Sequence, residues 1–219
     1  MAYTTAIFDM DGTILDTLDD LADSVNYALG LHGMPASPRP EVRQHLGNGM
    51  DYLIAHSVPA ATPRELEQQI LAEFKADYAK RCIVKTAPYP GILDLMAELR
   101  RRGIARAVVS NKGDFAVQEL VERYFPGVFD IAVGEREGIR RKPAPDTVYA
   151  VMHELGAAPA DVVYIGDSEV DVETARNAGI ACIAVDWGFR DHDVLVGLGA
   201  PVIVSDTRAL LDEICHPQD

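Results

Sequence analysis

The spacing of apolar residues changes along the chain, and each change predicts a different kind of structure. Residues 4–8 form a short, mostly apolar run with β-branched and aromatic side chains, which predicts a strand buried on both faces. Over residues 17–32 the apolar positions recur at helical spacing, which predicts an amphipathic helix with Thr17 as its N-cap. Short helical pieces are predicted on both sides of a turn at 47–49, and a longer helix over 63–81.

The long interval without a strand predicts an insertion. No strand is predicted between Asp16 and Ile83, and this interval is too long for one crossover helix between two parallel strands. We therefore interpret it as an inserted all-helical cap domain. The expected organisation is a discontinuous core, residues 1–16 and 85–219, with the helical cap at 17–84.

After Gly91 the pattern becomes an alternation of helices and strands. Helices are predicted over 92–102, 114–124, 146–155 and 170–178, and strands over 105–110, 129–133, 161–165, 181–185 and 201–204. This alternation predicts an α/β fold, a Rossmann-like open parallel sheet with helices on both faces. The strand at residues 4–8 belongs to the same sheet.

Charge and cysteine content narrow the class of protein. A net charge of −14 argues against nucleic acid or an anionic membrane as partner. No apolar run approaches the length of a membrane span, and the N-terminus lacks the pattern of a signal peptide. The three cysteines, Cys82, Cys182 and Cys215, are far apart and not in metal-ligand spacing. We expect a cytoplasmic monomer or homodimer that acts on a small molecule.

Small polar or charged residues follow four of the apolar segments. Open parallel sheets bind ligands at the carboxyl ends of their strands, so we expect these residues to surround one site. In chain order they are Asp9 with Asp11, Ser110 with Asn111 and Lys112, Lys142 with Pro143, and Asp167 with Asp171.

The aspartates in this set are suited to a metal ion. Asp9 and Asp11 point to the same side of an extended chain, where their repulsion is relieved by a proton or a cation. Asp9 and Asp167, together with waters, can supply the oxygen ligands that Mg²⁺ prefers. Asp171 lies one helical turn after Asp167, where it can support the metal or orient Lys142.

The remaining residues are suited to a phosphate group. The hydroxyl of Ser110 and the N–H groups after it are expected at the start of a helix, a position that favours phosphate. Lys142 adds a local positive charge in a chain whose net charge is −14. Together these residues predict a phosphate held by a metal, a lysine and N–H donors, beside a carboxylate that is free to attack phosphorus.

With these motifs in this order, the chain resembles the haloacid dehalogenase superfamily of phosphatases. Within it, the chain is most similar to the phosphoglycolate phosphatase branch, which carries a helical cap after the first strand. The resemblance covers nearly the whole length. The motifs that carry it are Asp9-Met10-Asp11-Gly12-Thr13, Ser110-Asn111-Lys112, Lys142-Pro143, and Gly166-Asp167 with Asp171.

The resemblance implies a mechanism. Asp9 would attack phosphorus and form an aspartyl-phosphate, and Asp11 would act as general acid and then general base. The dehalogenases of the superfamily do not need this acid. The resemblance further implies phosphate binding by Thr13, Ser110 and Asn111, charge neutralisation by Lys142, and Mg²⁺ ligation by Asp9, Asp167 and the main-chain carbonyl of Asp11, with Asp171 in support.

The expected substrate is a small phosphorylated metabolite such as 2-phosphoglycolate, selected by the cap. Closure of the cap would exclude water from the site. The cap residues that we expect to meet the substrate carboxylate are Arg43, His45, Gly47 and Asn48.

Other functions remain open at this point. The same fold also supports a sugar phosphomutase, a pyrophosphatase or a nucleotide phosphatase. A phospho-acceptor signalling module uses similar residues, but it places its acceptor on a later strand and has no cap of this size.

Overall fold

A parallel sheet is the centre of the fold. The computed structural model describes residues 2–217, and within them six parallel strands pair in the order β5-β4-β1-β6-β7-β8. The strands are β1 (Thr5–Phe8), β4 (Ala105–Gly113), β5 (Ile131–Glu135), β6 (Val162–Gly166), β7 (Ala181–Val185) and β8 (Ile203–Val204). β1 is central, because Phe8 lies opposite Val108 of β4 on one side and Ile165 of β6 on the other.

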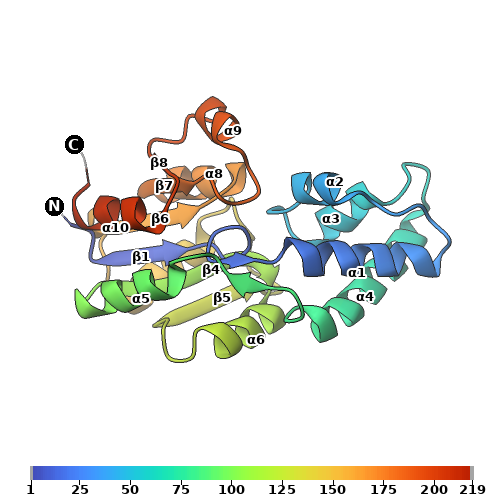
Figure 1. The fold of residues 1–219 in the computed structure, drawn as a ribbon, viewed down its shortest axis with the longest axis horizontal. Coiled ribbons are helices and arrows are strands. Elements are labelled where there is room, and N and C mark those ends of the chain that lie inside the picture. The colour runs from blue at the N-terminus through green and yellow to red at the C-terminus, as the bar shows by residue number, and fades with distance from the viewer. Residues whose placement is uncertain (1, 218–219) are drawn as a thin grey trace.

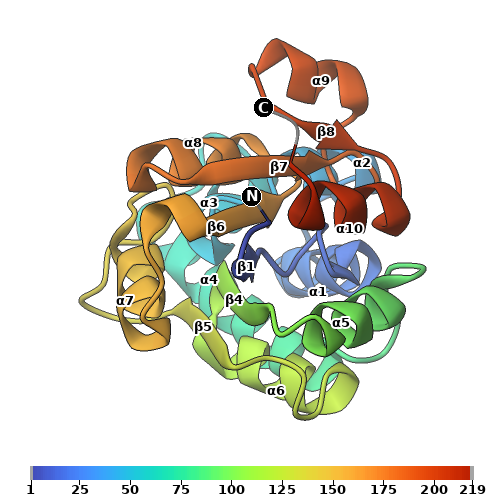
Figure 2. The same ribbon diagram turned by 90° about the vertical axis from the view of Figure 1, so that its left-hand side faces the viewer.

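Helices cover both faces of this sheet. One face packs against α5 (Ile92–Arg101), α6 (Asp114–Tyr124) and α10 (Thr207–Cys215), and the other against α7 (Asp146–Leu155) and α8 (Glu169–Ala178) (Figure 2). Side chains alternate along β1, so Ala6 and Phe8 join the first core and Ile7 joins the second. A short helix, α9 (His192–Gly197), and a 3₁₀ turn, η1 (Pro159–Asp161), complete this lobe. The predicted open parallel sheet with helices on both faces is confirmed.

The structure differs from the predicted elements mainly near chain turns. The strand predicted to end at Ser110 continues to Gly113, because residues 110–112 form a bulge between two regular pairings with β5. The last strand begins at Ile203 rather than at residue 201. α9 and α10 were not predicted, although Asp206 caps α10 by accepting the N–H groups of Arg208 and Ala209.

The four helices α1–α4 form a second lobe, which we call the helical lobe. Their bounds are α1 (Leu18–Leu31), α2 (Arg39–Gln44), α3 (Met50–Ser57) and α4 (Arg64–Arg81). They pack around their own buried cluster, which includes Val25, Leu29, Ile54 and Phe74. Residues 17–84 contain helices, turns and loops and no strand, and the lobe lies beyond the carboxyl ends of the sheet strands (Figure 1).

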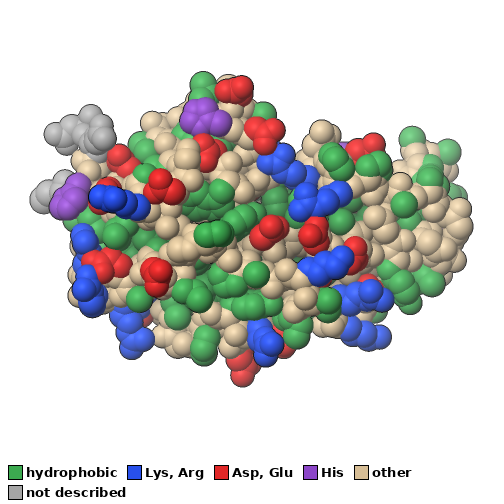
Figure 3. Space-filling view, in the orientation of Figure 1, with side chains coloured by type: hydrophobic (Ala, Val, Ile, Leu, Met, Phe, Trp, Pro, Cys, Tyr) green, Lys and Arg blue, Asp and Glu red, His purple; other side chains and the backbone are tan. Residues whose placement is uncertain are grey.

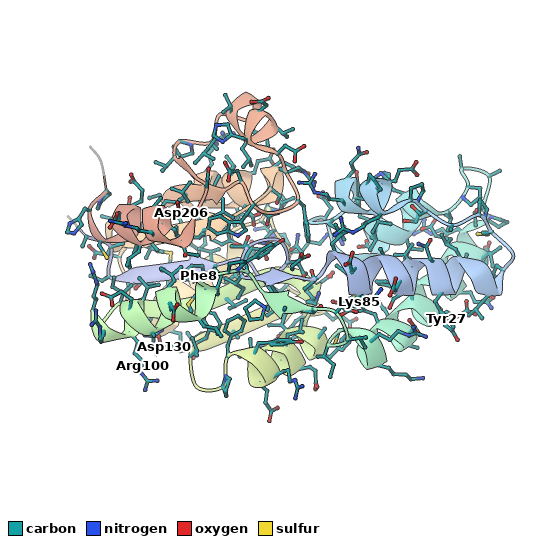
Figure 4. The ribbon with its side chains drawn as sticks, in the orientation of Figure 1. Phe8, Tyr27, Lys85, Arg100, Asp130 and Asp206 are labelled. Atoms are coloured by element: carbon teal, nitrogen blue, oxygen red, sulfur yellow. The ribbon has the colours of Figure 1, made fainter. Side chains whose placement is uncertain are left out.

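Two short chain segments join the helical lobe to the sheet. β2 (Leu15–Asp16) pairs antiparallel with β3 (Ala87–Pro88) at the base of the lobe. The buried carboxylate of Asp20 in α1 accepts the N–H groups of Lys85 and Thr86, which holds the returning chain against α1. Figure 4 shows Lys85 at this position.

Thr17 stands at the N-cap position of α1, as predicted, but its hydroxyl does not cap the helix. It donates to Asp11 Oδ1 at 2.7 Å instead. The predicted capping role is therefore wrong: the Thr17 hydroxyl is directed toward Asp11, and its oxygen accepts no N–H of the first turn of α1.

Charged side chains of both signs gather where the two lobes meet (Figure 3). Ion pairs cross this junction, among them Arg43 with Asp191 at 2.8 Å and Arg141 with Asp51. Over residues 2–217, none of the helices combines the length and apolar character needed to cross a bilayer.

Candidate active site

Three of the predicted aspartates converge at the carboxyl end of the sheet. Asp9 follows β1, Asp167 follows β6, and Asp171 lies in the first turn of α8. One carboxylate oxygen from each lies within 4.8 Å of the others, and all three residues are buried. The predicted ammonium lies beside them, with Lys142 Nζ 3.1 Å from Asp9 Oδ1 and 2.8 Å from Asp171 Oδ1.

Lys142 is fixed by contacts to its side chain and its backbone. Nζ donates to the hydroxyl of Tyr164 at 2.9 Å, and that hydroxyl donates to the carbonyl of Val109. The Asn111 side chain accepts the N–H of Lys142 at 2.8 Å and donates to its carbonyl at 3.0 Å. The amide of Asn111, predicted to bind phosphate, therefore positions Lys142 in this structure, and it also donates to the carbonyl of Gly47 at 3.0 Å.

The start of α8 orients Asp171. Its Oδ2 accepts the N–H of Asp167 at 3.2 Å and both the N–H and the hydroxyl of Ser168, at 3.1 and 2.6 Å. These contacts leave Oδ1 of Asp171 to accept a hydrogen bond from Lys142. Orienting Lys142 was one of the two roles predicted for Asp171.

Asp167 is held by two donors from other loops. The hydroxyl of Thr13 donates to Oδ1 at 2.9 Å, and the N–H of Phe189 donates to Oδ2 at 2.7 Å. The Thr13 hydroxyl, predicted to bind phosphate, is thus committed to Asp167 here. Gly12, at φ +80°, and Gly188 pack so closely on Asp167 that a Cβ at either position would collide with its side chain.

Burial dominates the electrostatics of this cluster. It raises the pKa of Asp9 to about 6, although Lys142 opposes the rise, and it raises the pKa of Asp167 well above its usual range, with Asp171 and Asp9 adding to the effect. Burial alone would lower the pKa of Lys142, but Asp171 and Asp9 raise it well above its ordinary value. Three buried carboxylates share one ammonium, so the donor set fits a divalent cation.

Asp11 stands apart from this cluster. Its Oδ1 accepts from the hydroxyl of Thr17 and from Nζ of Lys112, each at 2.7 Å. The Lys112 side chain is 1% exposed, and its ammonium lies 4.7 Å from the centre of the Tyr78 ring in α4. From sequence, Lys112 was expected among the residues around the site, with no role of its own.

Ser110 is near the site. It was predicted to lie at a helix start, and that prediction is wrong. α6 begins at Asp114, and Ser110 lies in the bulge of β4. The bulge is possible because the facing residue of β5 is Gly134, where a Cβ would collide with the carbonyl of Lys112. The Ser110 hydroxyl accepts the N–H of Lys112 at 3.3 Å.

A small cavity lies above these residues, between the two lobes. Its volume is about 30 Å³, enough for only a few atoms. Polar residues of the sheet lobe form its floor, and the helical lobe contributes a mostly apolar roof. The lining residues are Asp9, Asp11, Ser110, Asn111 and Lys112 from the floor, and Leu21, Leu46, Gly47, Gly49, Met50 and Leu53 from the roof.

Of the four residues predicted to meet the substrate from the cap, Gly47 lines the cavity. Arg43 turns away and donates to the carbonyl of Gly188 at 2.9 Å and to Asp191. His45 packs against His56, with ring centres 5.1 Å apart, and Asn48 is half-buried outside the lining. This placement gives no support to Arg43 or His45 as ligands of a substrate carboxylate.

Residues 188–191, which we call the strap, were missed from sequence. The strap follows β7 and binds the helical lobe: Phe189 is part of that lobe's buried cluster, and Arg190 donates to the carbonyls of Arg43 at 3.2 Å and Leu46 at 3.1 Å. Arg190 also pairs with Glu169 at 2.7 Å. A loop without periodicity offers no signal for these contacts, which depend on distant partners.

Comparisons with known proteins show what this chain is similar to. A model of the haloacid dehalogenase-like hydrolase family matches residues 6–185. Phosphoglycolate phosphatase 1 of Pseudomonas aeruginosa is 32% identical, over 97% of this chain and 82% of its own length. The N-acetylmuramic acid 6-phosphate phosphatase of the same organism is 30% identical, over 97% of this chain and 95% of its own.

Among solved structures, one from Lactobacillus delbrueckii subsp. bulgaricus, provisionally classed as a phosphoglycolate phosphatase, superposes with a TM-score of 0.94. It is 42% identical, and the match covers 99% of this chain and 100% of that one. The similarity therefore extends over both lobes.

Proposed function

Because the chain belongs to the haloacid dehalogenase-like hydrolases and is a phosphatase, we propose that it hydrolyses the phosphate monoester of a small metabolite such as 2-phosphoglycolate. The reaction passes through an aspartyl-phosphate on Asp9 and depends on Mg²⁺. The observation that carries the proposal is the position of Asp9, buried beside Lys142 and two further carboxylates at the floor of a small cavity.

The residues present fit a magnesium ion. Asp9, Asp167 and the main-chain carbonyl of Asp11 would hold it, and Asp171 would support it through Lys142 and the start of α8. When bound, the ion offsets the negative charge of the nucleophile and of the phosphoryl oxygens. Burial raises the pKa of Asp9 and of Asp167, and a bound cation would favour the ionised form of both.

The chemistry takes place on this chain's own residues in two steps. An Asp9 oxygen forms a bond to phosphorus as the ester P–O bond breaks, and Asp11 gives its proton to the leaving alcohol. Water then attacks the same phosphorus, Asp11 takes a proton from it, and the bond between Asp9 and phosphorus breaks to release phosphate. Lys142 offsets the charge of Asp9 and the phosphate in both steps.

The nucleophile is already oriented. Asp9 Oδ1 accepts the N–H of Met10 at 2.6 Å and faces Lys142. Oδ2 accepts no hydrogen bond from any residue in the described part of the chain. One oxygen is therefore anchored while the other is available for attack.

The helical lobe, residues 17–84, acts as the cap in this proposal. Leu21, Leu46, Met50 and Leu53 close the cavity from above and would exclude bulk water from the aspartyl-phosphate. The phosphoglycolate phosphatases among the similar proteins support 2-phosphoglycolate over hexose phosphates, nucleotides and N-acetylmuramic acid 6-phosphate.

The test is a comparison of kcat/KM across phosphoglycolate, hexose phosphates, nucleotides and pyrophosphate. We expect phosphoglycolate to be preferred; sugar isomerisation without phosphate release would instead identify a mutase. Asp9→Asn should abolish turnover with an unchanged circular dichroism spectrum, because an amide is not a nucleophile for phosphorus. Asp193→Asn, on exposed α9, is the matched control and should keep wild-type activity. Full activity in Asp9→Asn would refute the mechanism.

A further inference from the structure

Lys112 is a charged residue of this site to which the proposed reaction gives no role. Of the described residues that line the cavity, Lys112 is the one that carries a positive charge. An ammonium that is 1% exposed is costly to bury, so it needs nearby partners. The mechanism above uses Asp9, Asp11 and Lys142, and it gives Lys112 no task.

Lys112 has unused hydrogen-bonding capacity. A lysine ammonium carries three N–H donors. Nζ donates to Asp11 at 2.7 Å and faces the ring of Tyr78, and it has no other acceptor among residues 2–217. Two donors thus have no acceptor among the described residues, in a residue that lines a cavity with an apolar roof.

We propose that Lys112 binds a carboxylate of the substrate and selects phosphate esters of small 2-hydroxy acids. This inference rests on the proposed function, in which Asp11 protonates the ester oxygen. In such an ester the carboxylate carbon is two bonds from that oxygen. Because Lys112 Nζ lies 2.7 Å from Asp11 Oδ1, one substrate places its ester oxygen at Asp11 and its carboxylate at Lys112.

The neighbouring cations are not available for this role. Lys142 is already bound to Asp9, Asp171 and Tyr164. Arg43 pairs with Asp191 outside the cavity, and Arg141, next to Gly49, pairs with Asp51 and Glu135. Lys75 is exposed on α4 and lies on an outer cleft beside Met50, not on the cavity. Selection for a carboxylate therefore falls to Lys112.

The experiment compares two esters that differ in that carboxylate. Initial rates give kcat/KM for 2-phosphoglycolate and for 2-hydroxyethyl phosphate, in which an alcohol replaces the carboxylate. The wild-type enzyme should prefer phosphoglycolate, and Lys112→Met should reduce that preference by roughly 10- to 100-fold, the range for one charge-assisted hydrogen bond. Lys75→Met removes the same charge from the exposed site and should leave the preference unchanged.

The outcomes distinguish a failure of this inference from a failure of the proposed function. If Lys112→Met lowers both rates by the same factor, Lys112 only positions Asp11, and the carboxylate assignment is overturned. If the wild-type enzyme hydrolyses neither ester, the proposed function itself fails. Lys112→Gln removes the charge but keeps a hydrogen-bond donor. It should show the same loss of preference, and it provides the measurement should Lys112→Met fail to fold.

Discussion

Lys142→Met should destabilise the protein strongly, because one ammonium balances two buried carboxylates. Its Nζ lies 3.1 Å from Asp9 and 2.8 Å from Asp171, and all three side chains are at most 6% exposed. Removing one partner of a buried ion pair costs about 3–5 kcal/mol, since the remaining charge is left uncompensated. For a protein of this size, that loss corresponds to a decrease in Tm of roughly 6–20 °C.

The stability lost in Lys142→Met should increase as the pH rises. The pKa of Asp9 is raised to about 6 in the folded protein, from about 3.9 in an unfolded chain, so ionisation of Asp9 reduces stability as the pH rises through this window. Lys142 opposes that rise in pKa, so its removal extends the window upward. The difference in stability between wild type and Lys142→Met should therefore be larger at pH 7.5 than at pH 5.

Urea denaturation in EDTA, at both pH values, measures this difference. Lys75→Met is the control: it removes an exposed lysine and should change the unfolding free energy by no more than about 0.5 kcal/mol. A loss below about 1 kcal/mol in Lys142→Met, or an equal loss at both pH values, would show that the cluster does not depend on this lysine as argued.

Two further predictions concern the carboxylate cluster. In thermal denaturation, Mg²⁺ should raise Tm more at pH 7.5 than at pH 5. Metal ligands must be deprotonated, so protons compete with the cation for Asp9. Equal shifts in Tm at both pH values would contradict the assigned ligands. Gly188→Ala should displace Asp167 and cost about 1–3 kcal/mol of stability together with most of kcat. The control is Gly197→Ala, where a Cβ meets nothing within 4 Å; this variant should fold and turn over normally. An active Gly188→Ala enzyme would show that Asp167 tolerates displacement.

The parts of the site that sequence could predict are those governed by local pattern. Asp9 and Asp167 were found because each follows a buried strand, and the carboxyl ends of parallel strands share one edge of the sheet. Lys142 and Asp171 followed from the motifs that surround them. The structure brings all four residues together. A local pattern and a general rule of sheet topology were sufficient to predict this.

Residues whose position depends on a distant partner were harder to predict. The bulge that moves Ser110 out of the helix start depends on Gly134 in the neighbouring strand. Arg43 was predicted to meet the substrate carboxylate, yet it pairs with Asp191, almost 150 residues later in the chain. The amide of Asn111 satisfies the backbone of Lys142. In each case the competing contact comes from tertiary structure, which a single sequence does not encode locally.

The strap makes the two lobes interdependent in a way that matters for protein engineering. The N–H of Phe189 donates to Asp167, and the ring of Phe189 packs inside the helical lobe. Arg190 donates to two carbonyls of that lobe. A chimera that exchanged residues 17–84 for the helices of a relative would therefore join foreign helices to a native strap. Such an exchange needs residues 188–191 from the same donor, although they lie far downstream in the gene.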